Sequence, residues 1–184
     1  MKKKPLLHIK PTHCAFMRGV NVKGTAMKMA DVCAVFEKAG VKNVSSVLAS
    51  GNILFTTEAK ADDIKTILEK ALSDHFNYEA FLFIKDKSDI EAITGQNPFE
   101  TEADFHIYSF VGIEEVEHSL MTAFEKSAKA EREEGLIIRN NFYWKVPKGN
   151  TLESQFGKIL GRKDMKSTFT SRNMNTFEKI LKKM

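Results

Sequence analysis

The sequence of 184 residues predicts an α+β fold made of two ferredoxin-like halves in tandem, followed by a C-terminal helix. Three observations support this prediction. Strand and helix patterns alternate in the order β-α-β-β-α-β, which defines the ferredoxin-like arrangement. A cluster of breakers at residues 95–99, GQNPF, interrupts the pattern, and the same order then starts again. We therefore expect one half at residues 1–95 and the second half, with the final helix, at residues 96–184.

The first half contains four expected strands and three expected helices. Apolar residues alternate or run continuously in the strands, which we place at residues 14–18, 44–48, 52–57 and 78–84. Apolar residues recur at helical spacing in the helices, which we place at residues 28–39, from Asp62 to about residue 72, and at 88–94. Gly19 and Gly51 each stand where a strand meets a turn, so we expect a positive φ angle at both.

The second half repeats this order with almost no residue-level similarity to the first. The strands are expected at residues 105–111, 136–139, 142–146 and 167–169, with a tight turn at Asn140 and Asn141. The helices are expected at residues 114–129 and 152–160, and the final helix is lined by Met174, Phe177, Ile180 and Leu181.

Composition limits the functional classes. No stretch approaches the roughly 18 apolar residues that a membrane span needs, and the basic start lacks the apolar stretch of a signal peptide. We therefore expect a cytoplasmic protein. The two cysteines, Cys14 and Cys33, fall at apolar positions of a strand and a helix, which favours buried thiols over a disulfide.

Charge is unevenly distributed along the chain. Residues 135–184 hold 11 Lys and Arg against 3 Asp and Glu, a local balance of +8, although the whole chain carries only +4. Such a basic segment attracts phosphates or nucleic acid, and its alternative role is a solvated surface that keeps the protein soluble.

The first half contains the motifs RGVNVKG, KMADV, GVKNV and ASGNILF, and NPF, FYWKVP and TSRNMNTFEKIL follow farther along the chain. Together these motifs resemble those of an uncharacterised family, domain of unknown function 1697. The resemblance implies a duplicated α+β architecture and no established activity. Met174 stands where the family usually has tryptophan, and the loop at residues 148–152 is shorter than usual and lacks a basic R-S-K element.

The loop at residues 18–24, RGVNVKG, is a candidate anion site. It is not a dinucleotide-binding turn, because Asn21 occupies the central glycine position, and it is not a P-loop, because Thr25 follows Gly24 directly. A glycine-bounded loop that leads into a helix can still hold an anion, with side chains of Arg18, Asn21, Lys23 and Lys28. A purely structural turn is the alternative.

A second polar cluster spans Thr170 to Thr176 at an expected helix start. Arg172, Asn173 and Asn175 could hold a phosphate or carboxylate there, whereas Thr170 or Ser171 could simply cap the helix. Basic residues upstream extend this cluster into a possible nucleic-acid patch, namely Lys158, Arg162, Lys163 and Lys166. We expect this cluster and the Arg18 loop to lie near each other and to form one anion site.

Aromatic residues, the Ser50 to Asn52 turn and the histidines give weaker indications of a functional site. Tyr143 and Trp144 are neighbours on one strand, so their side chains point to opposite faces of the sheet. We expect one of them in the core and the other free to stack on a base, and we include Trp144 in the candidate nucleic-acid patch. No histidine is tied by a motif to Ser50, so we interpret Ser50 to Asn52 as a hairpin turn, with Asn52 as a further candidate ligand residue. The histidines lack metal-ligand spacing, so we expect neither a metal nor a cofactor.

Three functions fit these observations. The first is a non-catalytic binding protein for a phosphate-bearing ligand, either a small molecule or nucleic acid. The second is a small-molecule enzyme with its site between the two halves, although no general base stands among Arg18, Asn21, Asn52, Arg172 and Asn173. The third is an interaction module whose polar motifs are all structural.

Overall fold

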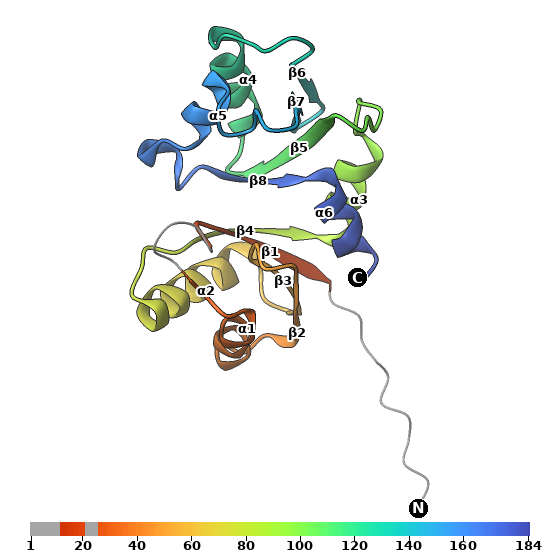
Figure 1. Cartoon of the computed structure of the whole chain (residues 1–184). Helices are drawn as coiled ribbons and strands as arrows, with labels where there is room; N and C mark the ends of the chain where they lie inside the picture. The colour runs from red at the N-terminus through yellow and green to blue at the C-terminus, as the bar shows by residue number, and fades with distance from the viewer. Residues whose placement is uncertain (1–11, 21–25) are drawn as a thin grey trace, which may run out of the picture.

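The computed structural model describes residues 12–20 and 26–184, which form two separate four-stranded antiparallel sheets (Figure 1). The strand order is β2-β3-β1-β4 in the first sheet and β6-β7-β5-β8 in the second. The two orders correspond strand for strand, and both are ferredoxin-like. The predicted α+β fold, with two such halves and a C-terminal helix, is confirmed.

The first sheet is covered by helices on both faces. Its strands are β1 (His13–Arg18), β2 (Lys42–Val47), β3 (Asn52–Thr56) and β4 (Phe81–Asp86). The helices are α1 (Met29–Lys38), α2 (Ala61–Phe76) and α3 (Lys87–Gly95). In β1, Ala15 and Met17 point to the face that α1 and α2 cover, whereas Cys14 and Phe16 point to the face that α3 covers.

The second sheet has the same design. Its strands are β5 (Phe105–Gly112), β6 (Glu134–Ile138), β7 (Asn141–Pro147) and β8 (Phe169–Asn173). Helices α4 (Val116–Lys126) and α5 (Gln155–Leu160) cover its outer face, and a 3-10 turn at Lys163–Met165 leads into β8. The chain ends with α6 (Met174–Leu181), which covers the inner face.

The two halves share one hydrophobic core between their sheets. Helices α3 and α6 pack against each other there, and their apolar residues meet those of both sheets (Figure 1). Phe16 of β1, for example, lies 5.4 Å from Phe177 of α6, measured between ring centroids. Layers therefore follow in the order helices, sheet, helices, sheet, helices.

Several element boundaries differ by two or more residues from the sequence-based expectations, and three of these differences concern segments at or next to the candidate site. Strand β4 begins at Phe81 instead of Tyr78, because α2 ends on a left-handed Asn77 and the N–H of Ala80 donates to Ser73 Oγ. Strand β8 covers residues 169–173 instead of 167–169, so the polar cluster at 170–173 is a strand and not a helix start. Helix α5 begins at Gln155, three residues after its expected start at residue 152.

Within the described parts of the chain, no helix is both long and apolar enough to cross a membrane. Gly19 and Gly51 have φ angles of 75° and 73°, which confirms the positive φ expected at both. In the β6–β7 turn, the residue with positive φ is Arg139, not either asparagine.

The two glycines provide a matched test of backbone strain. Among the described residues, a Cβ atom at Gly19 would meet nothing within 4 Å, whereas one at Gly51 would lie 2.9 Å from Met17 Cβ. Gly19→Ala should therefore lower the free energy of unfolding by about 1 kcal/mol, from the positive φ alone. Gly51→Ala should lower it by about 3 kcal/mol, because overpacking adds to the strain. Urea denaturation measures both losses, and equal losses would contradict this assignment.

Candidate functional site

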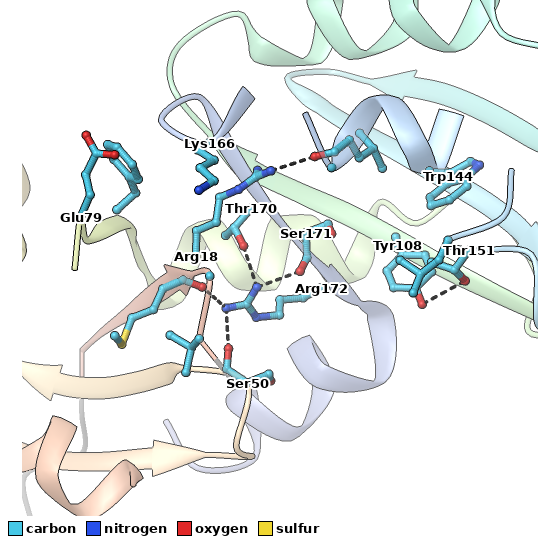
Figure 2. A pocket seen from close by; sticks show the side chains of 18 of the residues that line it. Arg18, Ser50, Glu79, Tyr108, Trp144, Thr151, Lys166, Thr170, Ser171 and Arg172 are labelled. Carbon is cyan, nitrogen blue, oxygen red and sulfur yellow. Dashed lines mark hydrogen bonds between the residues drawn. The ribbon is translucent and has the colours of Figure 1, made fainter. Parts of the chain in front are cut away.

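A cleft of about 690 Å³ lies between the two halves, beside the C-terminal end of β1 and the N-terminal ends of β4 and β8 (Figure 2). The first half contributes the end of β1, the β2–β3 turn and the segment before β4. The second half contributes strands β5, β7 and β8, helix α5 and the loop before it. The side chains central to the chemistry of this cleft are Arg18, Ser50, Tyr78, Glu79, Phe81, Tyr108, Trp144, Thr151, Leu152, Lys166, Thr170, Ser171 and Arg172.

Arg172 extends from β8 across the junction and binds the first half. Its Nε donates to Asn52 Oδ1 at 2.6 Å, and its Nη2 donates to the carbonyl oxygens of Met17 at 2.7 Å and Ser50 at 2.9 Å. Its Nη1 donates to Thr170 Oγ1 and to the Ser171 carbonyl, both at 2.8 Å. All five N–H donors of the guanidinium are therefore used.

This arrangement corrects the expectation that Arg172 holds a ligand directly or belongs to an exposed basic patch. The side chain is buried and has no free donor for a phosphate. Its acceptors are neutral, and no ion pair to Arg172 forms within the described residues. Burial, with a smaller effect of the nearby Arg18 charge, lowers the pKa of Arg172 to about 10, so it stays charged at neutral pH.

Asn52 is likewise structural. It is completely buried at the start of β3, where its Nδ2 donates to the Val47 carbonyl at 2.8 Å and to Ser50 Oγ at 3.0 Å. Its Oδ1 accepts from Arg172. The sequence-based expectation of a hairpin turn at this place is therefore correct, and Asn52 acts as the link between that turn and Arg172.

Arg18 keeps donors for a ligand. It lies at the end of β1, half-buried, and stacks over the Phe169 ring at 4.5 Å. Its Nη1 donates to the Phe169 carbonyl and its Nη2 to the Leu160 carbonyl, so three N–H donors make no bond to the described residues. Burial lowers the pKa of Arg18. Lys166, exposed, lines the same cleft from the segment before β8 (Figure 2).

The second half supplies an aromatic wall. Tyr108 of β5 and Trp144 of β7 are register partners, with ring centroids 5.6 Å apart, and the Tyr108 hydroxyl lies 3.4 Å from Thr151 Oγ1 (Figure 2). Trp144 is only 1% exposed, and its Nε1 donates to Glu133 Oε1 at 2.9 Å. The expectation of an exposed, stacking Trp144 is therefore wrong, because helices cover both faces of this sheet and bury Tyr143 as well.

The segment before β4 forms another wall with Tyr78 and Glu79. The Tyr78 hydroxyl is buried and has no hydrogen-bond partner among the described residues. Burial, helped by the Glu69 carboxylate, raises the pKa of Tyr78 to about 12, so the hydroxyl is protonated at neutral pH. Glu79 is the one acidic residue among the described side chains of the cleft.

The remaining predicted residues lie elsewhere. Asn173 and Asn175 line a separate pocket of about 200 Å³, where Asn173 contacts His106 Nδ1 and caps α6 by accepting from the Asn175 N–H. The cap is therefore Asn173, not Thr170 or Ser171. Lys28 is exposed at the start of α1 and does not line the cleft.

Asn21 and Lys23 fall outside the described residues. The rest of the Arg18 loop and the segment 170–172 do meet at the cleft, as expected, but through strands β1 and β8 and not through two helix starts.

The basic residues of the predicted patch are exposed along α5 and the 3-10 turn. Lys158, Arg162 and Lys163 do not line the cleft, and Arg162 is paired with Asp164 at 2.8 Å. Only Lys166 from this set reaches it. No group of three or more His, Cys, Asp or Glu side chains in the described residues is placed to hold a metal ion.

Sequence reasoning missed Tyr78, Glu79, Tyr108, Thr151 and Leu152 as residues of the cleft. The sequence pattern places Tyr78 and Glu79 in the strand expected at residues 78–84, and it gives Tyr108 no feature that other strand residues lack. Leu152, an apolar residue in a polar loop, is the only one with a local signal, and its exposed fraction is 77%.

The structural role of Arg172 can be tested by substitution. Arg172→Met should lower the free energy of unfolding by at least about 3 kcal/mol, because the Ser50 carbonyl and Asn52 Oδ1 lose their buried donor. The exposed Arg162→Met serves as the control and should change stability by less than about 0.5 kcal/mol. Urea denaturation gives both values. A loss below about 1 kcal/mol at Arg172 would show that the contact between the halves does not depend on it.

Comparison with known proteins agrees with this architecture. A structure of a conserved bacterial protein from Streptococcus pneumoniae, SP0830, is similar in fold, with a TM-score of 0.75 and 20% sequence identity. The similarity covers 95% of this chain and 98% of that protein. No protein of curated function matches the sequence. Residues 11–143 match the family described as "Protein of unknown function (DUF1697)", and the chain belongs to this family.

Proposed function

We propose that this protein is a non-catalytic binding protein for a small phosphate-bearing molecule, which it holds in the cleft between its halves. The observation that carries this proposal is a cleft in which Arg18 and Lys166 are available and the buried Arg172 adds a third positive charge. Among the described residues that line the cleft, three cations face one acidic side chain, Glu79. An anionic ligand would balance the excess positive charge of the cleft.

The electrostatics favour an anion more strongly than the formal charges alone suggest. Arg172 is bonded only to neutral acceptors among the described residues, so its charge is not cancelled at short range. A low-dielectric cleft focuses such a potential. Arg18 offers planar N–H donors suited to phosphate oxygens, and Thr170 and Ser171 line the same cleft.

The side chains of the cleft support binding more than catalysis. Among the described residues that line it, there is no histidine and no cysteine, and Glu79 is the only carboxylate. General acid–base or nucleophilic catalysis needs an activated group within reach of the reacting atom. The one side-chain partner of the Ser50 hydroxyl among the described residues is the Asn52 amide, which cannot act as a general base.

A small molecule fits better than a polynucleotide. The aromatic residues expected to stack on bases, Trp144 and Tyr143, are buried, and Arg172 is not on the surface. Arg162 of the predicted patch is paired with Asp164, which leaves lysines as the other exposed positive charges of that patch. The cytoplasmic location predicted from the sequence is retained as part of this proposal.

Two neighbouring lysines allow a controlled test. In calorimetric titrations with pyrophosphate and the four nucleoside monophosphates, at least one compound should bind. Lys166→Ala should weaken that binding about tenfold, as expected for loss of a charge-assisted hydrogen bond. Lys163→Ala removes the same charge from an exposed residue outside the cleft and should leave the affinity unchanged.

Two results would contradict the proposal. Absence of binding by every compound would remove the small-molecule function. Tighter binding of a single-stranded RNA, weakened equally by Lys163→Ala and Lys166→Ala, would instead indicate a nucleic-acid-binding surface, because phosphate contacts along a strand involve all nearby cations.

A further inference from the structure

We infer that the ligand carries an aromatic ring joined to its phosphate, and that its chemical class is a nucleoside monophosphate. This inference rests on the proposed function and concerns the part of the cleft that a phosphate cannot occupy. It is drawn from the size of the cleft, from its apolar and aromatic walls, and from one buried hydroxyl that has no partner among the described residues.

The cleft is much larger than a phosphate group. Its volume of about 690 Å³ lies within the range of roughly 300–1,000 Å³ that is typical of pockets for drug-sized ligands. Inorganic phosphate beside Arg18 and Lys166 would leave most of this space, and all of its aromatic wall, without contact. A ligand that matches the whole cleft therefore has a second, less polar part.

The aromatic wall is built as a rigid platform. The half-buried Tyr108 packs on Trp144, with an angle of 31° between the ring planes. The Phe156 ring packs against Trp144, with 5.1 Å between the ring centroids, and the Glu133 carboxylate accepts a hydrogen bond from Trp144 Nε1. Tyr108 is thus fixed in place and faces the cleft, an arrangement suited to stacking on a planar ring.

Apolar side chains continue this surface at the rim. Leu152 has the largest exposed fraction, 77%, of the exposed large hydrophobic residues described in the chain, and it lines the cleft. The half-buried Phe81 lines the cleft from the first half. An aromatic ring in the cleft would cover apolar surface that otherwise faces solvent.

The Tyr78 hydroxyl needs a hydrogen-bond partner, and an aromatic ring with polar atoms can supply one. Its buried hydroxyl lacks a partner among the described residues, and leaving a buried polar group unsatisfied is costly. Because this hydroxyl is protonated at neutral pH, it can donate to a ring nitrogen or ring carbonyl. The neighbouring Glu79 carboxylate can accept from an exocyclic amino group or a ring N–H. Nucleobases carry both kinds of group.

The test compares three parts of one ligand. The affinities of AMP, GMP, CMP and UMP are measured beside those of ribose 5-phosphate and adenosine, by calorimetry and by fluorescence of Trp144, the single tryptophan of the chain. At least one nucleoside monophosphate should bind about tenfold or more tightly than ribose 5-phosphate, as expected for one stacked base. Adenosine, which lacks the phosphate, should bind more weakly than AMP.

Variants locate the ring. Tyr108→Leu preserves bulk and should weaken nucleotide binding about tenfold while leaving ribose 5-phosphate unaffected, which also shows that the variant is folded. Tyr78→Phe should weaken only the nucleotides whose base accepts its hydrogen bond. Leu152→Ser should weaken all four nucleotides, and Leu136→Ser, at an exposed leucine outside the cleft, should have no effect.

The possible failures are distinguishable. If ribose 5-phosphate or pyrophosphate binds as tightly as every nucleotide and Lys166→Ala weakens it, the phosphate site stands and the aromatic ligand is excluded. If adenosine binds as tightly as AMP, the phosphate site itself is wrong. If nucleotides bind but Tyr108→Leu has no effect, the ring does not lie on the proposed wall, and the inference is overturned.

Discussion

The arrangement of the two halves depends on one buried guanidinium. Arg172 makes six hydrogen bonds, four of them to Met17, Ser50, Gly51 and Asn52 of the first half. The β2–β3 turn presents its carbonyl oxygens to this side chain, and the positive φ of Gly51 makes that turn possible. Because the acceptors are neutral, the junction is closed without cancelling the positive charge beside the cleft. The same interaction therefore supports both the fold and the proposed binding of an anion.

Helices α3 and α6 explain why a cleft exists at all. They fill the space between the two sheets on one side, where the shared core includes Phe16, Phe83 and Phe177. On the other side, the ends of β1, β4 and β8 approach each other without a helix between them, and Arg172 bridges the gap. Walls from both halves then enclose a space that neither half could form alone. A ligand in this cleft would contact both halves at once.

Local patterns predicted the element order of both halves, because apolar periodicity reflects which face of each strand and helix is buried. They also pointed to Arg18 and to segment 170–172. They did not reveal the burial of Arg172, since an arginine in a polar run gives no local sign of four acceptors in the other half of the chain. Trp144 was misjudged because alternation implies one exposed face, whereas both faces of this sheet are covered. Tyr78 and Tyr108 line the same cleft only because the two halves pack together, which no local pattern encodes.

We expect the two halves to unfold as one cooperative unit, because the shared core and Arg172 join them. Equilibrium urea unfolding tests it most directly, followed in parallel by Trp144 fluorescence and by far-ultraviolet circular dichroism. Trp144 reports only on the second half, whereas circular dichroism reports on the helices and strands of both halves. The structure predicts coincident transitions with the same midpoint and the same slope, as in a two-state protein. Two separated transitions, with only one of them seen by Trp144, would contradict it.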